Sequence, residues 1–208
     1  MEKPARAPIW KVGVPQVVYM ALGAALYAGL SVATNVIALP SIGRVSLRPG
    51  IVIPLFFGAV FGPIVGLFTG LVGNFLGDLI SGYGIYWNWD LGNGIIGLVA
   101  GLALYSTVRG AWGRYTRPTQ IAIVEALSAL GILIGIAFAA YTDIWVSKYN
   151  FAGATSEFIP AFLSDFICGL ILLPIFLTAY NAATARRGIY TQDGGEDTPT
   201  PLTPTTEG

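Results

Sequence analysis

The chain has 208 residues, of which 54% are hydrophobic and 11% are charged, and its eleven basic residues balance eleven acidic ones. A soluble domain carries about 25% charged residues, so this composition argues against a soluble fold and indicates an integral membrane protein. The zero net charge offers no basic surface for nucleic acid, the single cysteine excludes an internal disulfide, and the absence of histidine removes the commonest metal ligand and proton shuttle. We therefore expect no metal, no cofactor and no catalytic residues.

Six apolar stretches are predicted to form membrane helices, since about 20 apolar residues cross a hydrocarbon core of about 30 Å. The first is too long for the apolar part of a signal peptide. Prolines suit the first position of a helix, and Pro49 and Pro63 begin the second and third stretches. The second is short for a full crossing, and only Gly62-Pro63 separates it from the third, so these two could instead form one broken element. The six stretches cover about 15–38, 49–61, 63–80, 92–108, 119–140 and 159–183.

The basic residues give these stretches an orientation. With the N-terminus in the cytoplasm, eight of the eleven basic residues fall inside, and only Arg44, Arg48 and Lys148 fall outside. The positive-inside rule therefore supports six crossings with both ends in the cytoplasm. Three parts are predicted: a cytoplasmic segment 1–14, a six-helix transmembrane substrate-binding domain 15–187, and a tail 188–208. The tail is rich in Thr, Pro and Gly and is expected to be disordered and cytoplasmic.

Glycines recur at every fourth position through the second and third stretches, and the spacing reappears in the fourth. Small residues at this spacing let helix backbones approach closely in lipid, and we interpret them mainly as packing contacts within the protein. The glycines concerned are Gly58, Gly62, Gly66, Gly70, Gly97 and Gly101.

The first stretch carries a stripe of small residues of its own, Ala21, Ala25 and Gly29, with Ala24 and Ala28 beside it. Such a stripe suits packing within the protein, and it equally suits the docking of another protein's helices. Periodicity alone does not distinguish the two.

Polar and aromatic side chains gather between the third and fourth stretches and between the fifth and sixth, both on the predicted outer side. Ionisable residues within a membrane helix are costly and line a cavity or pair with each other, and Asp78 and Asp165 fit this description best. Aromatic walls with a few fixed polar groups suit a small, flat, polar ligand. The predicted substrate-binding residues are Arg48, Asn74, Asp78, Tyr83, Tyr86, Trp87, Trp89, Asp90, Asn93, Tyr141, Asp143, Trp145 and Asp165.

The predicted loop around residues 83–93 has a second explanation, because Trp and Tyr also collect at the membrane interface as anchors. Its aromatic, amide, acidic and glycine residues are more than an anchor needs, so we favour ligand binding. The acidic residues on the outer side favour a cationic or amine-bearing ligand; they are Asp78, Asp90, Asp143, Glu157 and Asp165.

The order of these motifs resembles the substrate-binding S components of energy-coupling factor (ECF) transporters. The resemblance covers roughly residues 15–183, and its most specific part is Phe61-Gly62-Pro63 with the trailing glycines and Asp78. The full pattern is Arg48-Pro49-x4-Pro54, then Gly58-x2-Phe61-Gly62-Pro63-x2-Gly66-x3-Gly70-x2-Gly73-x4-Asp78, then Gly92-x-Gly94-x2-Gly97-x3-Gly101.

This resemblance implies a six-helix bundle in a prokaryotic plasma membrane, with an outer pocket for a vitamin or related micronutrient that the loop 42–48 closes. It also implies a coupling membrane subunit and two ATPase subunits as partners. In that family the coupling subunit docks on small residues of the first helix, a pattern that Ala21 and Ala25 match. The sequence has no Gly-rich phosphate loop with Lys and Ser/Thr, which agrees with a subunit that is not itself an enzyme.

The substrate and two other functions stay open at this point. The aromatic and acidic segments suit a heteroaromatic compound with amino groups or a positive charge, such as a thiamine-like pyrimidine, with a flavin-like ring as the runner-up. A stand-alone channel or facilitator is the main alternative, with Asp78 and Asp165 lining a pore. An intramembrane enzyme that uses the same two carboxylates is the weakest.

Overall fold

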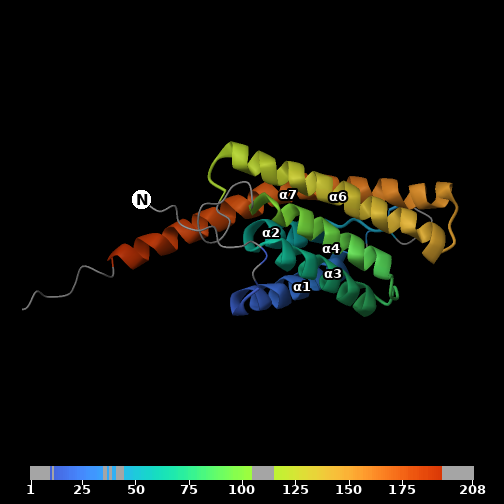
Figure 1. Cartoon of the computed structure of the whole chain (residues 1–208), viewed down its shortest axis with the longest axis horizontal. Helices are drawn as coiled ribbons and strands as arrows, with labels where there is room; N and C mark the ends of the chain where they lie inside the picture. Colours follow the sequence, from blue (N-terminus) through green and yellow to red (C-terminus); the bar gives the residue numbers. More distant parts are fainter. Residues whose placement is uncertain are drawn as a thin grey trace, which may run out of the picture.

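In the computed structural model, which describes Trp10 and residues 12–34, 37, 39–40, 45–104 and 115–193, the chain folds into a bundle of helices (Figure 1). The predicted all-helical fold is confirmed for this part of the chain, and each predicted stretch corresponds to one α-helix. The elements are α1 (Val14–Thr34), the short 3-10 helix η1 (Pro49–Ile51), α2 (Val52–Phe61), α3 (Pro63–Ser81), α4 (Trp87–Gly101), α6 (Pro118–Val146) and α7 (Phe151–Asp193).

Four of the helices, α1, α3, α6 and α7, are long and apolar enough to cross a membrane. They make this a multi-pass membrane protein. The segment Pro49–Phe61 is apolar but shorter, and α4 has 15 residues, which extend about 22 Å at 1.5 Å per residue. Six full crossings, and the orientation with both ends inside, therefore stay predictions.

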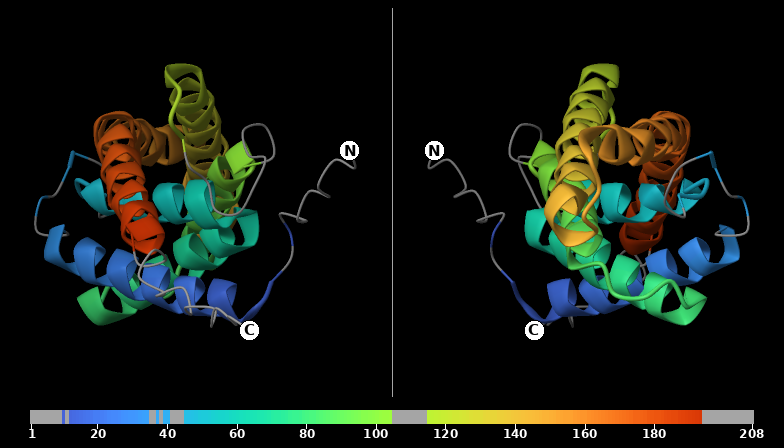
Figure 2. Two further views of the ribbon diagram at one scale, coloured as in Figure 1. Left: turned by 90° about the vertical axis from the view of Figure 1, so that its left-hand side faces the viewer. Right: turned by 90° about the vertical axis from the view of Figure 1, so that its right-hand side faces the viewer.

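The shortest α-helix, α2, lies in the interior of the bundle. Eight of its ten residues are buried, and it packs against α1, α3, α4 and α7. Viewed end-on, α1 lies at one edge of the bundle and α6 and α7 lie at the opposite edge (Figure 2). An apolar helix too short to span the hydrocarbon region is thus surrounded by protein.

The predicted break between the second and third stretches is real. Gly62 has φ = 113° and separates two helices, with Pro63 as the first residue of α3. A side chain is strained in this conformation, which glycine adopts freely. Gly62 is the only residue between the two helices.

The glycine series packs α2, α3 and α4 against one another, as predicted. A Cβ atom at Gly58 or Gly66 would collide with the backbone carbonyl of Gly97, and one at Gly97 would collide with the backbone of Gly66. Gly92 and Gly135 make a similar approach between α4 and α6. The helices lie so close here that only hydrogen fits as a side chain.

Three helix boundaries differ from the prediction, and the differences reshape the two polar segments. Helix α4 begins at Trp87, five residues before the predicted start, because the backbone N–H groups of Trp89 and Asp90 both bond to the carbonyl of Tyr86. The predicted loop over 83–93 is therefore helical from residue 87 onwards. Helix α6 continues to Val146, and α7 begins at Phe151, so only four residues connect them.

Helix α7 also continues to Asp193 and so includes the first residues of the predicted tail; it is the longest helix and extends beyond the others at one end (Figure 1). Other predictions lie outside the described residues. They are the segments 1–9 and 194–208, residues 42–44 of the loop 42–48, and the basic residues Lys3, Arg6, Lys11, Arg44, Arg109 and Arg114.

Candidate functional site

A cavity of about 500 Å³ opens at the end of the bundle where α1, α3 and α6 end and α4 and α7 begin. This volume is in the usual range for small-molecule sites. The lining residues come from the two polar segments that the sequence indicated, between α3 and α4 and between α6 and α7 with the flanking helix turns, and from the segment around Arg48 and the end of α1. They are Ser31, Val45, Ser46, Arg48, Asn74, Asp78, Gly82, Tyr83, Tyr86, Trp89, Asp143, Ser147, Tyr149 and Glu157.

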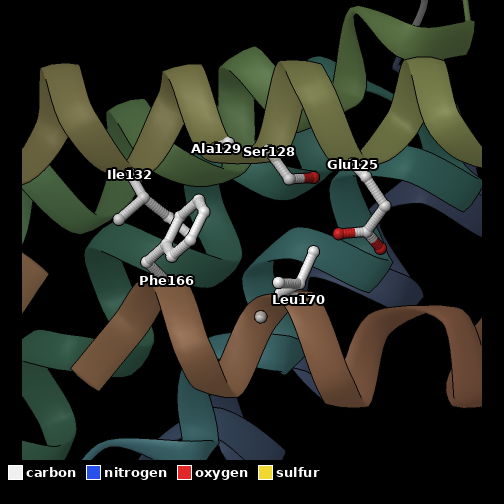
Figure 3. Close-up of a pocket in the computed structure, with 7 residues that line it drawn as sticks. Glu125, Ser128, Ala129, Ile132, Phe166 and Leu170 are labelled. Atoms are coloured by element: carbon white, nitrogen blue, oxygen red, sulfur yellow. The ribbon is translucent and has the colours of Figure 1, made fainter. Parts of the chain in front are cut away.

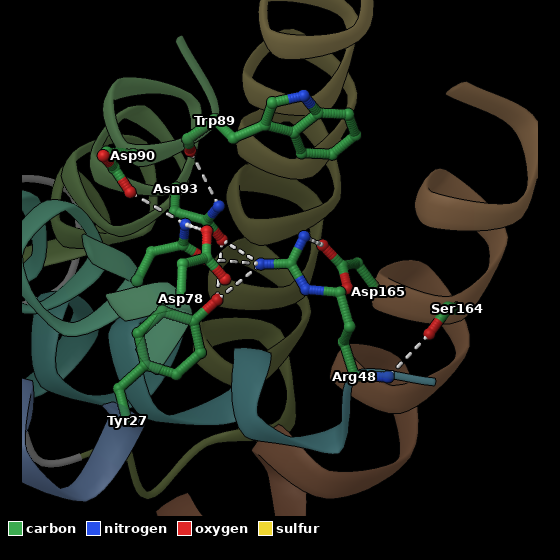
Figure 4. A network of polar contacts seen from close by, with 9 residues as sticks. Tyr27, Arg48, Asp78, Trp89, Asp90, Asn93, Ser164 and Asp165 are labelled. Carbon is green, nitrogen blue, oxygen red and sulfur yellow. Dashed lines mark hydrogen bonds and ion pairs between the residues drawn. The ribbon is translucent and has the colours of Figure 1, made fainter. Parts of the chain in front are cut away.

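Arg48 joins the elements around this cavity (Figure 4). Its Nη2 donates to the hydroxyl of Tyr27 at 2.7 Å, to Oδ1 of Asn93 at 2.6 Å and to Oδ1 of Asn74 at 3.2 Å. Its backbone N–H donates to Ser164 Oγ at 2.9 Å. The residue that precedes η1 is therefore fixed to α1, α3, α4 and α7 at once.

The side-chain amide of Asn74 contacts a cation with its oxygen and two carboxylates with its nitrogen. Its oxygen accepts from Arg48, while its Nδ2 donates to Asp78 at 3.0 Å and to Asp90 at 2.9 Å. Asn74 and Asp78 line the cavity, but Asp90 does not. The carboxylate of Asp78 is thus held in place at the cavity wall and has acceptor capacity left for a ligand.

Asp143 orients the aromatic wall. It is 2% exposed, and its carboxylate accepts from Trp89 Nε1 at 2.7 Å, from Asn88 Nδ2 at 3.0 Å and from Ser147 Oγ at 2.7 Å. Three donors on one carboxylate leave little capacity for a ligand. The geometry therefore gives Asp143 a supporting function, which is to fix the indole of Trp89.

The short α6–α7 connection and the start of α7 add a second acidic and aromatic pair to the cavity wall. Tyr149 lies in this connection, and Glu157 lies in the second turn of α7. Burial and the neighbouring carboxylates of Glu157 and Asp143 raise the pKa of the Tyr149 phenol. The phenol is therefore a neutral hydroxyl group beside the cavity at ordinary pH.

The predicted site residues fall into three groups. Seven line the cavity: Arg48, Asn74, Asp78, Tyr83, Tyr86, Trp89 and Asp143. Three lie behind the lining as part of the polar network, namely Asp90, Asn93 and Asp165. The other three lie away from the cavity: Trp87 and Trp145 are 54% and 70% exposed, and Tyr141 stacks on Phe151 between α6 and α7. For these three, the prediction from residue type was not specific enough, because aromatic residues serve several purposes in a membrane protein.

The sequence prediction also missed site residues. Tyr27 is fully buried and donates to Asn93 Oδ1 at 2.7 Å. Its hydroxyl-bearing ring, in the otherwise apolar and small-residue stretch 20–30 of α1, was the available signal. The serines that line the cavity, Ser31, Ser46 and Ser147, gave no such signal because serine is common in every setting.

Asp78 and Asp165 were considered as a carboxylate pair or as pore-lining groups. Figure 4 shows the guanidinium of Arg48 between them, and Asp165 is fully buried beside it. A cation between two carboxylates does not suit an acid–base pair. In the described part of the chain no group of three His, Cys, Asp or Glu side chains could hold a metal ion.

A second, much smaller cavity of about 10 Å³ lies between α6 and α7 (Figure 3). Glu125 and Ser128 line it together with apolar residues, and neither Glu125 Oε1 nor Ser128 Oγ has a hydrogen-bond partner among the described residues. The space holds about one water molecule. It is too small for a substrate.

Helix α1 has two different faces. Ala24, Tyr27 and Ala28 are buried, whereas Ala21, Ala25 and Gly29 are exposed. The sequence alone did not distinguish packing within the protein from docking of a partner for these small residues. In the structure one side of the helix packs within the protein, and the other faces the surroundings.

Comparison with known proteins identifies a matching family and a related protein. Residues 11–182 match the family described as ECF-type riboflavin transporter, S component. A UPF0397 protein of Vibrio atlanticus (strain LGP32) is 33% identical over 129 residues, which are 61% of this chain and 69% of the relative.

Proposed function

Because this chain belongs to the S-component family of ECF-type riboflavin transporters, as its motifs had indicated, we propose that it captures a vitamin-like molecule in the cavity around Arg48. It delivers this molecule to an ECF coupling subunit that two ATPases energise. One observation carries the proposal: a cavity of about 500 Å³, lined by fixed polar and aromatic groups, opens at one end of the bundle. The N-in, C-in orientation would place this end outside.

The lining supports an amine-bearing or cationic heteroaromatic substrate. Asp78 and Glu157 present carboxylates to the cavity, and Arg48, its one described basic residue, has Asp165 beside it at 3.7 Å. The lining therefore carries more negative than positive charge. Tyr83, Tyr86 and Trp89 provide flat aromatic surfaces. A thiamine-like pyrimidine suits this set best, and the description of the matching family keeps a flavin as the second candidate.

The partner surface belongs to the same proposal. The exposed residues Ala21, Ala25 and Gly29 form a flat stripe on α1, which a coupling subunit's helices can approach closely. The buried side of the same helix reaches the site through Tyr27.

The first experiment identifies the ligand that accompanies the purified protein, by mass spectrometry after denaturation, and then measures its affinity for three variants. We expect Asp78→Asn and Trp89→Ala to weaken binding about tenfold or more, roughly 1.4 kcal/mol. Trp87→Ala is the matched control, because this indole is two residues away and 54% exposed.

Three outcomes would contradict the proposal. Unchanged affinity in both site variants would move the pocket elsewhere. A protein that retains no ligand and binds none of the vitamin probes would not be a binding subunit. Solute flux through liposomes that contain the protein without ATP or partners would favour the facilitator instead.

A further inference from the structure

Asp165 is buried without the contacts that a buried carboxylate needs. It is fully buried in α7, and neither of its carboxylate oxygens has a hydrogen-bond partner among the described residues. The ion pair from its Oδ2 to Arg48 Nη1 measures 3.7 Å, about 1 Å longer than a charge-assisted hydrogen bond. A buried charge is costly unless it is paired and hydrogen-bonded. This arrangement leaves Asp165 only partly satisfied.

The other side of the same guanidinium is crowded. Three acceptors share the single nitrogen Nη2: the Tyr27 hydroxyl, Asn93 Oδ1 and Asn74 Oδ1. The contact with Asn74 is the longest of them at 3.2 Å. Arg48 thus lies between neutral acceptors on α1, α3 and α4, with the carboxylate of Asp78 on the same side, and the carboxylate of Asp165 on α7 (Figure 4).

We propose that Arg48 is a two-position latch, held by Tyr27 and Asn93 in the empty protein and drawn onto Asp165 when a cationic or amine-bearing ligand occupies the cavity. This inference rests on the proposed function, because the ligand's charge supplies the driving force. A positive group beside Asp78 repels the guanidinium and competes for the Asn74 oxygen, the weakest of its contacts. A shift of about 1 Å then completes the pair with Asp165.

The latch would act on the loop that precedes it. Val45 and Ser46 line the cavity and are three and two residues from Arg48 in the chain. The backbone of Arg48 is already bonded to Ser164, the neighbour of Asp165. Movement of the guanidinium towards α7 changes the contacts of this anchored residue, beside the end of the loop that lines the cavity. Asp165 is then a positioning residue, which acts on the ligand through Arg48.

The test uses the full-length protein in detergent, with thiamine as the cationic probe and riboflavin as the neutral one. We expect Asp165→Asn to weaken thiamine binding about tenfold. Infrared difference spectra should show a carboxylate band that shifts when thiamine binds to the wild type and that is absent from Asp165→Asn. A residue with only a structural role would give no ligand-dependent band.

Glu125→Gln is the matched control. Glu125 is another carboxyl within the helices with an oxygen that lacks a partner among the described residues, but it faces the small α6–α7 cavity. Its variant should keep both the wild-type affinity and the shifting band.

Several results would overturn the latch. Wild-type thiamine affinity in Asp165→Asn, or a carboxylate band that does not respond to thiamine, contradicts it while the proposed function stands. Binding of riboflavin but not thiamine contradicts the proposed substrate class and the latch together. If Asp165→Asn does not fold, Asp165→Glu replaces it: the longer side chain should reach Arg48 without ligand and reduce the band shift, and a full shift would contradict the latch.

Discussion

At the scale of single residues, Asp143 determines the shape of the aromatic side of the cavity. Its carboxylate accepts from Trp89, Asn88 and Ser147, and Asn88 is fully buried. Networks of this kind fix side chains in one arrangement when every member is satisfied, and they are costly when one member is lost. The function of Asp143 therefore depends on the three donors around it more than on the ligand.

Asp143→Ala should destabilise the protein, because it leaves three donors without their acceptor. Asn88 is fully buried, whereas Trp89 and Ser147 are half-buried. A buried donor without a partner costs about 1–3 kcal/mol, so we expect a loss of about 2–4 kcal/mol. Thermal unfolding in detergent measures it. Ser147→Ala, which removes one donor and leaves the carboxylate satisfied by two, should cost about 1 kcal/mol. Equal melting temperatures for the two variants would show that Asp143 has no such supporting function.

At the scale of helices, the glycine contacts set how closely α3 and α4 approach. Gly97→Ala places a methyl group against the Gly66 backbone, which has no flexible side chain to move aside. We expect a loss of about 3 kcal/mol or more, since overpacked cores force backbone shifts. The amount of folded protein and its melting temperature in detergent report this loss.

Gly29→Ala is the control for that substitution, because nothing lies within 4 Å of the position where its Cβ would be. It should leave stability unchanged or raise it by up to about 1 kcal/mol, the intrinsic helix preference of alanine over glycine. A similar loss in both variants would indicate a general intolerance of α1 and α4 to alanine instead of a close contact.

The helices differed in how well the sequence predicted them. Long apolar stretches and proline starts predicted α1, α2 and α3 to within a few residues, because apolar surroundings and the geometry of proline leave few alternatives. The start of α4 was wrong because Trp87, Asn88 and Asp90 resemble an interfacial loop. Asn88 and Asp90 are tolerated in a helix here because Asn88 Nδ2 donates to Asp143 and Asp90 accepts from Asn74. Such partners, distant in sequence, are visible only in the fold.

The candidate site was predictable in the same partial way. Charged and amide residues in apolar surroundings pointed to Arg48, Asn74 and Asp78, and all three line the cavity. Such groups are rarely placed in apolar surroundings unless they are paired or line a cavity. Aromatic residues were less informative: Trp89 lines the cavity, whereas Trp87, two positions away, points elsewhere. The two side chains differ because residues two positions apart in a helix point in nearly opposite directions.

At the scale of the whole molecule, α1 connects the cavity with the surroundings. Ala21→Trp combined with Ala25→Trp should prevent co-purification with the coupling subunit, because two indoles would keep the partner's helices at a distance. Ligand affinity should stay within about twofold of the wild type, since both residues are exposed and on the face opposite Tyr27. Pull-down with the tagged coupling subunit and its ATPases measures the first effect.

Leu133→Trp provides the comparison for that double variant. Leu133 is 44% exposed on α6, at the opposite edge of the bundle from α1 (Figure 2). It should leave complex formation intact. Loss of the complex in this variant too, or an intact complex in the α1 variant, would remove α1 as the docking surface.

The single residue between α2 and α3 has a consequence for biosynthesis. Helix α2 is too short to cross a bilayer alone. The single residue Gly62 is too short a linker for α2 to remain in water while α3 inserts into the membrane. The segment Pro49–Ser81 must therefore enter the membrane as one hairpin, with its backbones already in contact. The insertion machinery would handle this protein in fewer steps than it has helices, and Gly62 would be the point at which the hairpin turns.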